Sequence, residues 1–180
     1  KTALFSDIHG NYRALEAVLK DAKTQGVQNF ACLGDIVGYG PNPADCVTKI
    51  QEIGCVCVKG NHDDDASTDR ELDDLSQHAQ TSLKWTRQRL SEAQKEWLAK
   101  LPMKRRLGRN MLVHASLNEV HLWEYITNRF DAEAAISKQT TPLCFFGHTH
   151  KPICYEAING TASILDQKQL FINPDNKYLV

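Results

Sequence analysis

The sequence predicts an α/β fold, because short apolar runs alternate with longer amphipathic segments along most of the chain. The pattern changes after Pro152 to short alternating segments around Asn159-Gly160, a strong hairpin signal. We therefore expect a parallel sheet with helices on its faces, followed by antiparallel strands on an outer or second sheet. The apolar runs expected to form strands are residues 2–5, 30–33, 55–58, 111–113 and 143–146.

Two helices are expected to connect the first three strands. Asn11 can cap the first helix, which runs to about Lys23. Asn42 can cap the second, which opens at Pro43 and ends at about Ile53. Each helix joins one strand to the next, and right-handed crossovers of this kind favour a parallel sheet.

A helical insertion is expected over about residues 66–102. Residues 76–101 predict two helices, of which the second opens with the capping-box pattern Ser91-x-x-Gln94 and closes before Pro102. We assign the large apolar side chains of this segment to packing rather than to substrate binding. They are Leu83, Trp85, Leu90, Trp97 and Leu98.

The carboxyl half continues with a hairpin and a helix. Gly108-Arg109-Asn110 predicts a turn between residues 104–107 and the run at residues 111–113. One more helix is expected from Asp131 to about Gln139, before the run at residues 143–146.

Composition is typical of a compact enzyme. The chain of 180 residues is expected to form a single domain over residues 1–180. Its formal net charge of −1, with acids and bases scattered, gives no strong nucleic-acid signal and no attraction to an anionic membrane.

The basic cluster Lys104-Arg105-Arg106 is expected on an exposed hairpin face, or alternatively at a substrate phosphate. The acidic run Asp63-Asp64-Asp65 is typical of a solvated loop or a helix start. The oligomeric state stays open.

The six cysteines include no Cys-x-x-Cys pair. Cys32, Cys55, Cys57 and Cys144 lie in apolar runs, where a thiol is usually a small buried hydrophobe. We expect reduced core cysteines in a cytoplasmic protein. Neither a bilayer-spanning stretch nor a signal segment is expected, and Lys1 already stands at the first strand.

Side chains of metal-ligand type follow every one of the five apolar runs. Because ligands bind beyond the carboxyl ends of strands in open α/β sheets, one strand per run would bring these side chains to one place. Any single one is more often a turn residue, a cap or a satisfied polar group. Five of the seven histidines lie in these motifs, however, and imidazole is the commonest protein metal ligand. Carboxylate, imidazole and amide ligands without thiolate suit Mn²⁺, Fe²⁺, Ni²⁺ or Zn²⁺.

The order of these motifs resembles the five signature blocks of the calcineurin-like metallophosphoesterase superfamily. The resemblance reaches from the first strand to about residue 152 and is similar to the compact single-domain bacterial and archaeal phosphodiesterases. It implies a two-sheet α/β sandwich with helices on the outer faces, acting as a metal-dependent phosphoric ester hydrolase. Relatives continue into an Asn-Pro-Gly-Ser stretch and further strands, so we expect the domain to be truncated at its C-terminus. The blocks are Asp7-x-His9, Gly34-Asp35, Gly60-Asn61-His62-Asp63, His114 and Gly147-His148-x-His150.

The resemblance implies a site for two divalent metal ions. In such a site the ions share a water, lower its pKa and provide a hydroxide for in-line attack on phosphorus. His62 matches the family's catalytic histidine, a general acid or oxyanion stabiliser, and its alternative role is support of the ligands. The implied ligands are Asp7, His9 and His150 for one ion, Asn61, His114 and His148 for the other, and Asp35 as the bridge.

Two departures from the family bear on the substrate. Protein phosphatases of the superfamily carry an Asp that orients the catalytic histidine and an Arg that grips the phosphate, where this chain has Gly38 and Tyr39. Loss of a bidentate guanidinium disfavours a monoester dianion, so a small phosphodiester or nucleotide-like substrate is expected. Phosphomonoesters, phosphoproteins and dinucleoside polyphosphates are alternatives, as is a non-catalytic scaffold. Asn118 and His121, in the loop after the fourth run, and Tyr39 are predicted to contact substrate.

Overall fold

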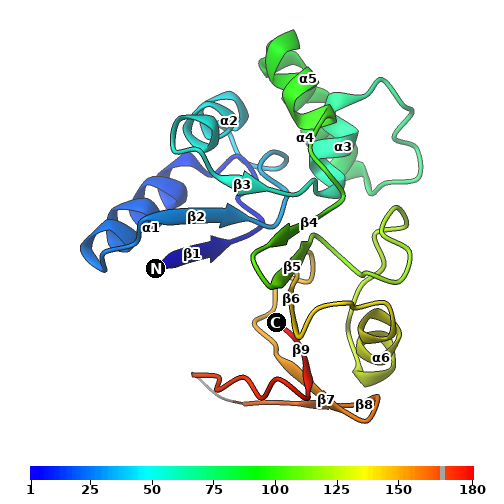
Figure 1. Ribbon diagram of the computed structural model, residues 1–180. Helices are drawn as coiled ribbons and strands as arrows, with labels where there is room; N and C mark the ends of the chain where they lie inside the picture. The colour runs from blue at the N-terminus through cyan, green and yellow to red at the C-terminus, as the bar shows by residue number, and fades with distance from the viewer. Residues whose placement is uncertain (167–168) are drawn as a thin grey trace. The chain divides into compact units, whose positions relative to one another are not determined.

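The computed structural model of the protein describes residues 1–166 and 169–180. These residues form six helices and nine strands, and the strands belong to two sheets (Figure 1). The chain divides into two compact units, residues 1–102 and residues 103–180, and each unit contains one sheet. The predicted α/β class with two sheets is confirmed.

The first unit is built on a parallel sheet of three strands in the order β1-β2-β3. Both crossovers are helical, as the sequence predicts. Asn11 caps the first helix by accepting the Ala14 N–H at 3.1 Å. Asn42 stands at the N-cap of the second, but its amide donates to the Asp45 carboxylate instead of accepting a backbone N–H. The elements are β1 (Thr2–Phe5), α1 (Tyr12–Thr24), β2 (Asn29–Cys32), α2 (Pro43–Glu52) and β3 (Val56–Cys57).

Three further helices complete the first unit: α3 (Asn61–Ser67), α4 (Gln77–Arg89) and α5 (Glu92–Ala99). The capping box at the start of α5 is confirmed, since Ser91 and Gln94 bond each other's backbone N–H. The buried leucines of α4 and α5 join the core formed by α1, α2 and the sheet. Trp97 packs against that core. Trp85 does not belong to it: the ring is half-buried beneath the Arg89 guanidinium, 5.1 Å from its centroid.

Helix α3 follows the third strand closely. The sequence predicts the acidic run in a solvated loop or at a helix start, and the helix start is confirmed, because Asp63 and Asp64 lie in the first turn of α3. Solvation is wrong for two members of the run, because Asp63 and Asp65 are buried. Asp65 accepts a hydrogen bond from Arg70, yet burial raises its pKa above the usual range.

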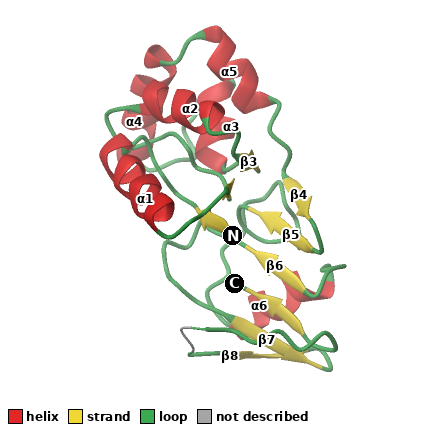
Figure 2. Cartoon of the chain, turned by 60° about the vertical axis from the view of Figure 1, so that its left-hand side comes forward, coloured by secondary structure: helices red, strands yellow, loops and turns green. Residues whose placement is uncertain are grey.

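The second unit contains a mixed sheet of six strands in the order β4-β5-β6-β9-β7-β8. The predicted hairpin at Asn159-Gly160 is confirmed, and both residues have positive φ, as a type I′ turn requires. Strand β9 is not predicted by the sequence, although it pairs with both β6 and β7. The elements are β4 (Lys104–Leu107), β5 (Asn110–Val113), α6 (Arg129–Ser137), β6 (Leu143–Phe145), β7 (Tyr155–Ile158), β8 (Thr161–Ile164) and β9 (Lys177–Leu179), with β8 at the outer edge (Figure 2).

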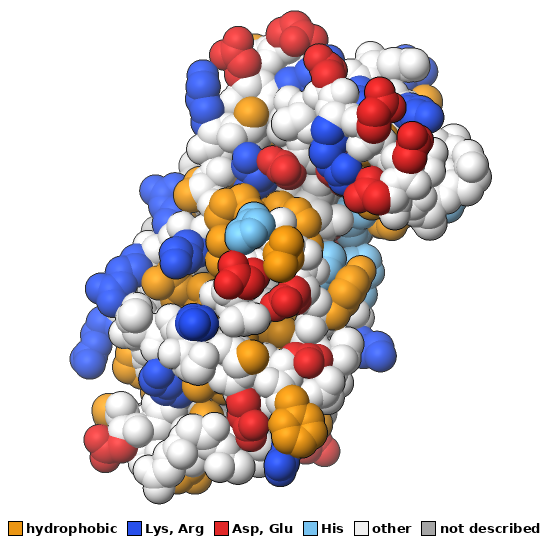
Figure 3. Space-filling view, turned by 90° about the vertical axis from the view of Figure 1, so that its right-hand side faces the viewer, with side chains coloured by type: hydrophobic (Ala, Val, Ile, Leu, Met, Phe, Trp, Pro, Cys, Tyr) orange, Lys and Arg blue, Asp and Glu red, His pale blue; other side chains and the backbone are white. Residues whose placement is uncertain are grey.

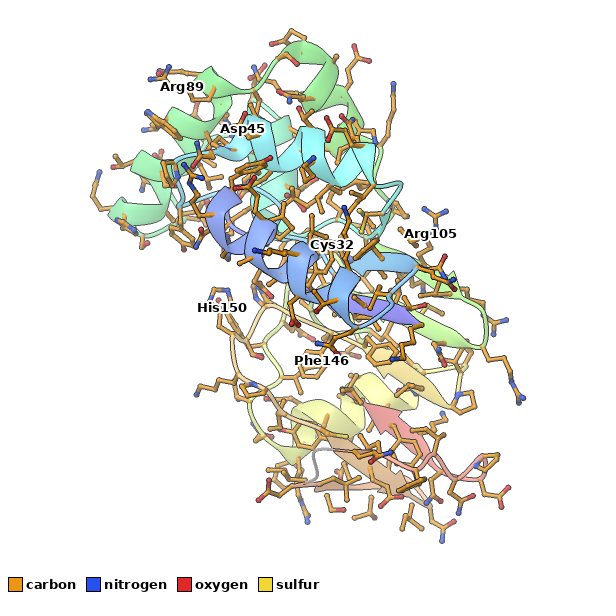
Figure 4. The ribbon with its side chains drawn as sticks, turned by 90° about the vertical axis from the view of Figure 1, so that its left-hand side faces the viewer. Cys32, Asp45, Arg89, Arg105, Phe146 and His150 are labelled. Carbon is orange, nitrogen blue, oxygen red and sulfur yellow. The ribbon has the colours of Figure 1, made fainter. Side chains whose placement is uncertain are left out.

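All six cysteines are free thiols. Cys32, Cys57 and Cys144 are buried as predicted, whereas Cys55 is only half-buried. Figure 4 shows Cys32 within the interior of the first unit and Arg105 pointing outward from β4. The exposed basic cluster of that hairpin is therefore confirmed.

The surface carries no field of a single charge on the face that Figure 3 shows, where acidic and basic side chains are interspersed. Within the described residues, none of the helices combines the length and the apolarity needed to cross a membrane.

Candidate active site

The loops that leave β1 and β2 run side by side beyond the sheet and bring the first three predicted ligands together. Backbone hydrogen bonds join Asp7 N–H to the Gly34 carbonyl at 3.1 Å and His9 N–H to the Asp35 carbonyl at 2.9 Å. These bonds continue the parallel pairing past the last strand residues. The strand ends therefore place Asp7, His9 and Asp35 at one edge of the sheet, as the sequence predicts.

The His9 imidazole is held so that one nitrogen faces two carboxylates. Its Nδ1 lies 3.2 Å from the Val37 carbonyl, and because a carbonyl only accepts, Nδ1 carries a proton and is the donor. Its Nε2 lies 3.7 Å from Asp35 Oδ2 and 3.9 Å from Asp7 Oδ1. A carbonyl that fixes the tautomer of a histidine in this way is typical of metal ligands. The donor set therefore fits a divalent cation.

His62 lies against the same group of side chains. Its backbone N–H donates to Asp35 Oδ1 at 2.9 Å, and its ring centroid lies 4.9 Å from that of His9. One potential ligand atom from each of His9, Asp35 and His62 lies within 4.8 Å of the others. Asn61, the neighbouring predicted ligand, is the first residue of α3. The cluster thus includes His62, which the sequence assigns to catalysis rather than to metal binding.

Asp63 holds this part of the molecule together, a role that the sequence does not predict. The carboxylate is fully buried. One oxygen accepts the N–H groups of Ile36 at 2.9 Å and Val37 at 3.2 Å, and the other accepts that of Gly60 at 3.0 Å. A single carboxylate therefore joins the segment after Asp35 to the start of α3. A buried acid can persist only with such partners. The available signal in the sequence was the position of Asp63 directly after Asn61 and His62.

Gly38 and Tyr39, which replace the two phosphatase groups, both contact His62. A Cβ atom on Gly38 would lie 2.5 Å from His62 Nδ1, so the ring packs directly on the glycine backbone. The Tyr39 ring centroid lies 4.6 Å from that of His62 and 5.5 Å from that of His78 on α4. Ser82 Oγ, one turn further along α4, accepts the Tyr39 N–H at 2.6 Å. The packing of glycine and tyrosine thus limits where the His62 ring can lie.

The site-forming loops concentrate backbone strain. Among the described residues, eight that are not glycine have left-handed φ, between 49° and 67°. Such values are uncommon and persist where the surrounding structure imposes them, often at functional sites. One is Asn159 of the hairpin, and the other seven are Asp7, His9, Asp35, Tyr39, Trp123, His148 and His150.

The second unit brings together two more predicted ligands. His114 follows β5 and His148 follows β6, and the His114 carbonyl accepts the Gly147 N–H at 2.8 Å. Both imidazoles are buried, and their ring centroids lie 5.0 Å apart. His150, labelled in Figure 4, lies two residues beyond His148 and is exposed.

In the loop after His114, Trp123 and Tyr125 contact these imidazoles, whereas the sequence selects Asn118 and His121 as substrate contacts. His121 is largely exposed, with Nδ1 4.0 Å from the Glu119 carboxylate. The Asn118 amide donates to the Glu124 carboxylate at 3.1 Å. Aromatic residues contact the histidines instead: Tyr125 stacks on His148, and Trp123 meets His114 edge-on. The signal for them was the presence of two aromatic residues in the loop.

Residues 1–175 match the calcineurin-like phosphoesterase superfamily domain. The chain is 32% identical over 182 residues to the uncharacterized protein MJ0912 of Methanocaldococcus jannaschii, a match that covers 99% of this chain and 73% of that protein.

Two solved structures are similar. A metallophosphoesterase from Sphaerobacter thermophilus is 33% identical with a TM-score of 0.80, over 99% of this chain and 74% of that chain. The hypothetical protein PH1004 from Pyrococcus horikoshii, 19% identical, shares the fold with a TM-score of 0.75, over 91% of this chain and 74% of that chain. With clusters of potential metal ligands at the ends of its strands, the chain belongs to the calcineurin-like phosphoesterase superfamily.

Proposed function

We propose that the protein is a metal-dependent hydrolase of small phosphodiesters. The observation that carries the preference for diesters is that Tyr39, and not an Arg, lies against His62, with ring centroids 4.6 Å apart. The neighbouring Gly38 also contacts that ring. Because a Cβ atom there would lie 2.5 Å from His62 Nδ1, the position has no room for a carboxylate side chain beside the ring. Tyr39 occupies the next position, where the phosphatases of the family carry their Arg. A monoester dianion would lack its bidentate partner, whereas a diester carries a single charge and needs it less.

The proposed metal ligands are those that the family relationship implies. Asp7, His9 and His150 would hold one ion, Asn61, His114 and His148 would hold the other, and Asp35 would serve both. Mn²⁺, Fe²⁺, Ni²⁺ or Zn²⁺ suits this donor set, and when bound such ions polarise phosphoryl oxygens and lower the pKa of water. The geometry of His9 supports this assignment, since its tautomer directs Nε2 toward Asp7 and Asp35.

The remaining chemistry falls to the protein's own groups. In the proposed reaction His62 donates a proton to the leaving oxygen, which departs from phosphorus on the side opposite the incoming oxygen. The position of the ring relative to Asp35 depends on the N–H that His62 donates to that carboxylate and on the packing of Gly38 and Tyr39. A nucleotide-like diester is the proposed substrate class. The free thiols support a cytoplasmic location.

Metal content and a substrate panel test the proposal together. The protein is stripped with a chelator, reloaded separately with the four metals, and assayed on p-nitrophenyl monoesters and diesters. We expect about two ions per chain by elemental analysis, and faster hydrolysis of diesters. Faster hydrolysis of monoesters would contradict the diester assignment, and equal activity without metal would contradict the mechanism.

Asp35→Asn tests the bridge in the same assay. We expect it to abolish hydrolysis and to lower the content of both ions, because one shared carboxylate charge is lost. Asp45→Asn, an exposed carboxylate on α2, is the matched control and should behave as the unaltered protein. Two tightly bound ions and normal turnover in Asp35→Asn would remove Asp35 from the bridge.

A further inference from the structure

Tyr125 covers one of the two buried histidines of the second unit and is itself exposed. Its ring centroid lies 4.0 Å from that of His148, with 27° between the planes, so the two rings are stacked. The residue nevertheless remains 59% exposed. Because one face of the ring is against His148, this exposure belongs to its other face and its edges. The outer face of Tyr125 is thus an exposed aromatic surface one ring away from a predicted metal ligand.

A second aromatic residue of the same loop, Trp123, contacts the other buried histidine of this unit. Its ring meets His114 edge-on, with centroids 5.9 Å apart and 73° between the planes. The backbone of Trp123 has a φ of 53°, which is rare for a bulky side chain and indicates a conformation that the surroundings impose.

The loop that carries both rings is anchored rather than loose. Glu124, between Trp123 and Tyr125, accepts a hydrogen bond from the Asn118 amide at 3.1 Å. The Asn118 backbone N–H donates to Ser116 Oγ at 3.0 Å, and the Leu122 N–H to the Glu119 carbonyl at 2.9 Å. These bonds hold the residues before the aromatic pair and Glu124 between its two members. A rigid ring loses little conformational entropy when a ligand stacks on it, which favours binding.

We propose that Tyr125 forms a platform on which a planar group of the substrate stacks, so that the preferred substrates are nucleoside or aryl phosphodiesters. The inference rests on the proposed function and names its substrate class. An aromatic face attracts a flat π-system irrespective of the pattern of hydrogen-bonding groups on its edge. The platform therefore selects for the presence of a nucleobase or aryl ring and discriminates little among the bases.

The test compares two diesters that share the trifluoroethanolate leaving group, which has no ring, and differ in the retained group, one carrying thymidine and the other methyl; fluorine NMR measures the released trifluoroethanol. Tyr125→Ala should lower kcat/KM for the thymidine diester about ten-fold, the loss expected for one stacked base, and should leave that for the methyl diester unchanged. Tyr125→Phe keeps the ring and should retain the preference. Phe130→Ala removes an equally exposed aromatic residue of the same unit, on α6, and should change neither substrate.

Binding of thymidine itself gives a readout that does not require catalysis. Saturation-transfer NMR on the full chain as purified should detect thymidine with the unaltered protein and lose that signal with Tyr125→Ala. Tyr125→Leu keeps an apolar cover on His148 without a ring, and it replaces the alanine variant if that variant fails to fold. Metal content should stay the same in every variant.

The outcomes separate the platform from the proposed function. Equal losses on both diesters, an unchanged substrate ratio, or a thymidine signal that survives in Tyr125→Ala would overturn the platform. A Tyr125-dependent thymidine signal in a protein that hydrolyses no phosphodiester would uphold the platform and refute the proposed function.

Discussion

The substitution Gly38→Ala should displace the proposed catalytic histidine without touching any predicted metal ligand. The added Cβ would lie 2.5 Å from His62 Nδ1 and 2.9 Å from its Cγ. Such atoms are in ordinary van der Waals contact at about 3.5 Å, so the distance between the added Cβ and the His62 ring must increase by roughly 1 Å. The backbone cannot easily supply it, because Asp63 holds Val37 on one side and Ser82 holds Tyr39 on the other. The His62 ring must therefore move.

A displacement of this size has a large effect on rate. Misplacing a reacting group by about 1 Å can lower turnover about 100-fold, and we expect that loss in kcat for an aryl phosphodiester. The alanine also carries a conformational cost of about 1–3 kcal/mol, because Gly38 has a φ of 93°. Steady-state kinetics, elemental analysis and thermal unfolding measure the three quantities separately.

Gly54→Ala supplies the matched control. Gly54 also has positive φ, at 60°, but an added Cβ meets no atom within 4 Å among the described residues. It should lower stability by about 1 kcal/mol and leave kcat unchanged. If Gly38→Ala loses stability but keeps normal turnover, the packing of Gly38 does not position His62 and the reasoning fails.

Three further predictions concern single residues. Asp63→Ala should lower the free energy of unfolding by at least about 3 kcal/mol, because three backbone N–H groups lose their acceptor. A loss below about 1 kcal/mol in urea denaturation would show that Asp63 does not hold these segments together. His62→Ala should lower turnover about 10²- to 10⁴-fold with metal retained, and most for poor leaving groups; equal losses across leaving groups would argue against proton donation. Burial raises the pKa of Cys46 to about 12 and that of Cys144 to about 12, so at pH 8 only about one thiol in ten thousand is ionised. Iodoacetamide at that pH should leave both unmodified in the folded protein, as read by mass spectrometry, and labelling should begin only as the pH rises toward 12 or the protein unfolds.

Local signals in the sequence predicted the helix starts and the turn that depend only on neighbouring residues. Asn11 begins α1 as expected, and Ser91 with Gln94 begins α5, because a cap needs only residues within one helical turn. The Asn159-Gly160 turn likewise requires only its own two conformations. The ligand types after the strands were also readable, since strand ends direct polar side chains to the edge of a sheet.

Features that depend on contacts between distant parts of the chain were decided only by the tertiary structure. The three-residue strand β9 is too short for any periodicity, and it forms because β6 and β7 pair with it on either side. The burial of Asp63 depends on donors 26 and 27 residues away in the chain, and charge alone favours a solvated carboxylate.

The loop after His114 shows the same division at the candidate site. Its sequence indicated a substrate-shaping segment, and hydrogen-bonding capacity favoured Asn118 and His121. The fold turns His121 outward, ties Asn118 to Glu124 and places Tyr125 on His148. A loop without periodicity does not reveal which side chains face inward, because that choice depends on backbone conformations such as the left-handed Trp123. The sequence alone thus identified the family and the side chains of metal-ligand type, while the packing of this loop determined which of its side chains contact His114 and His148.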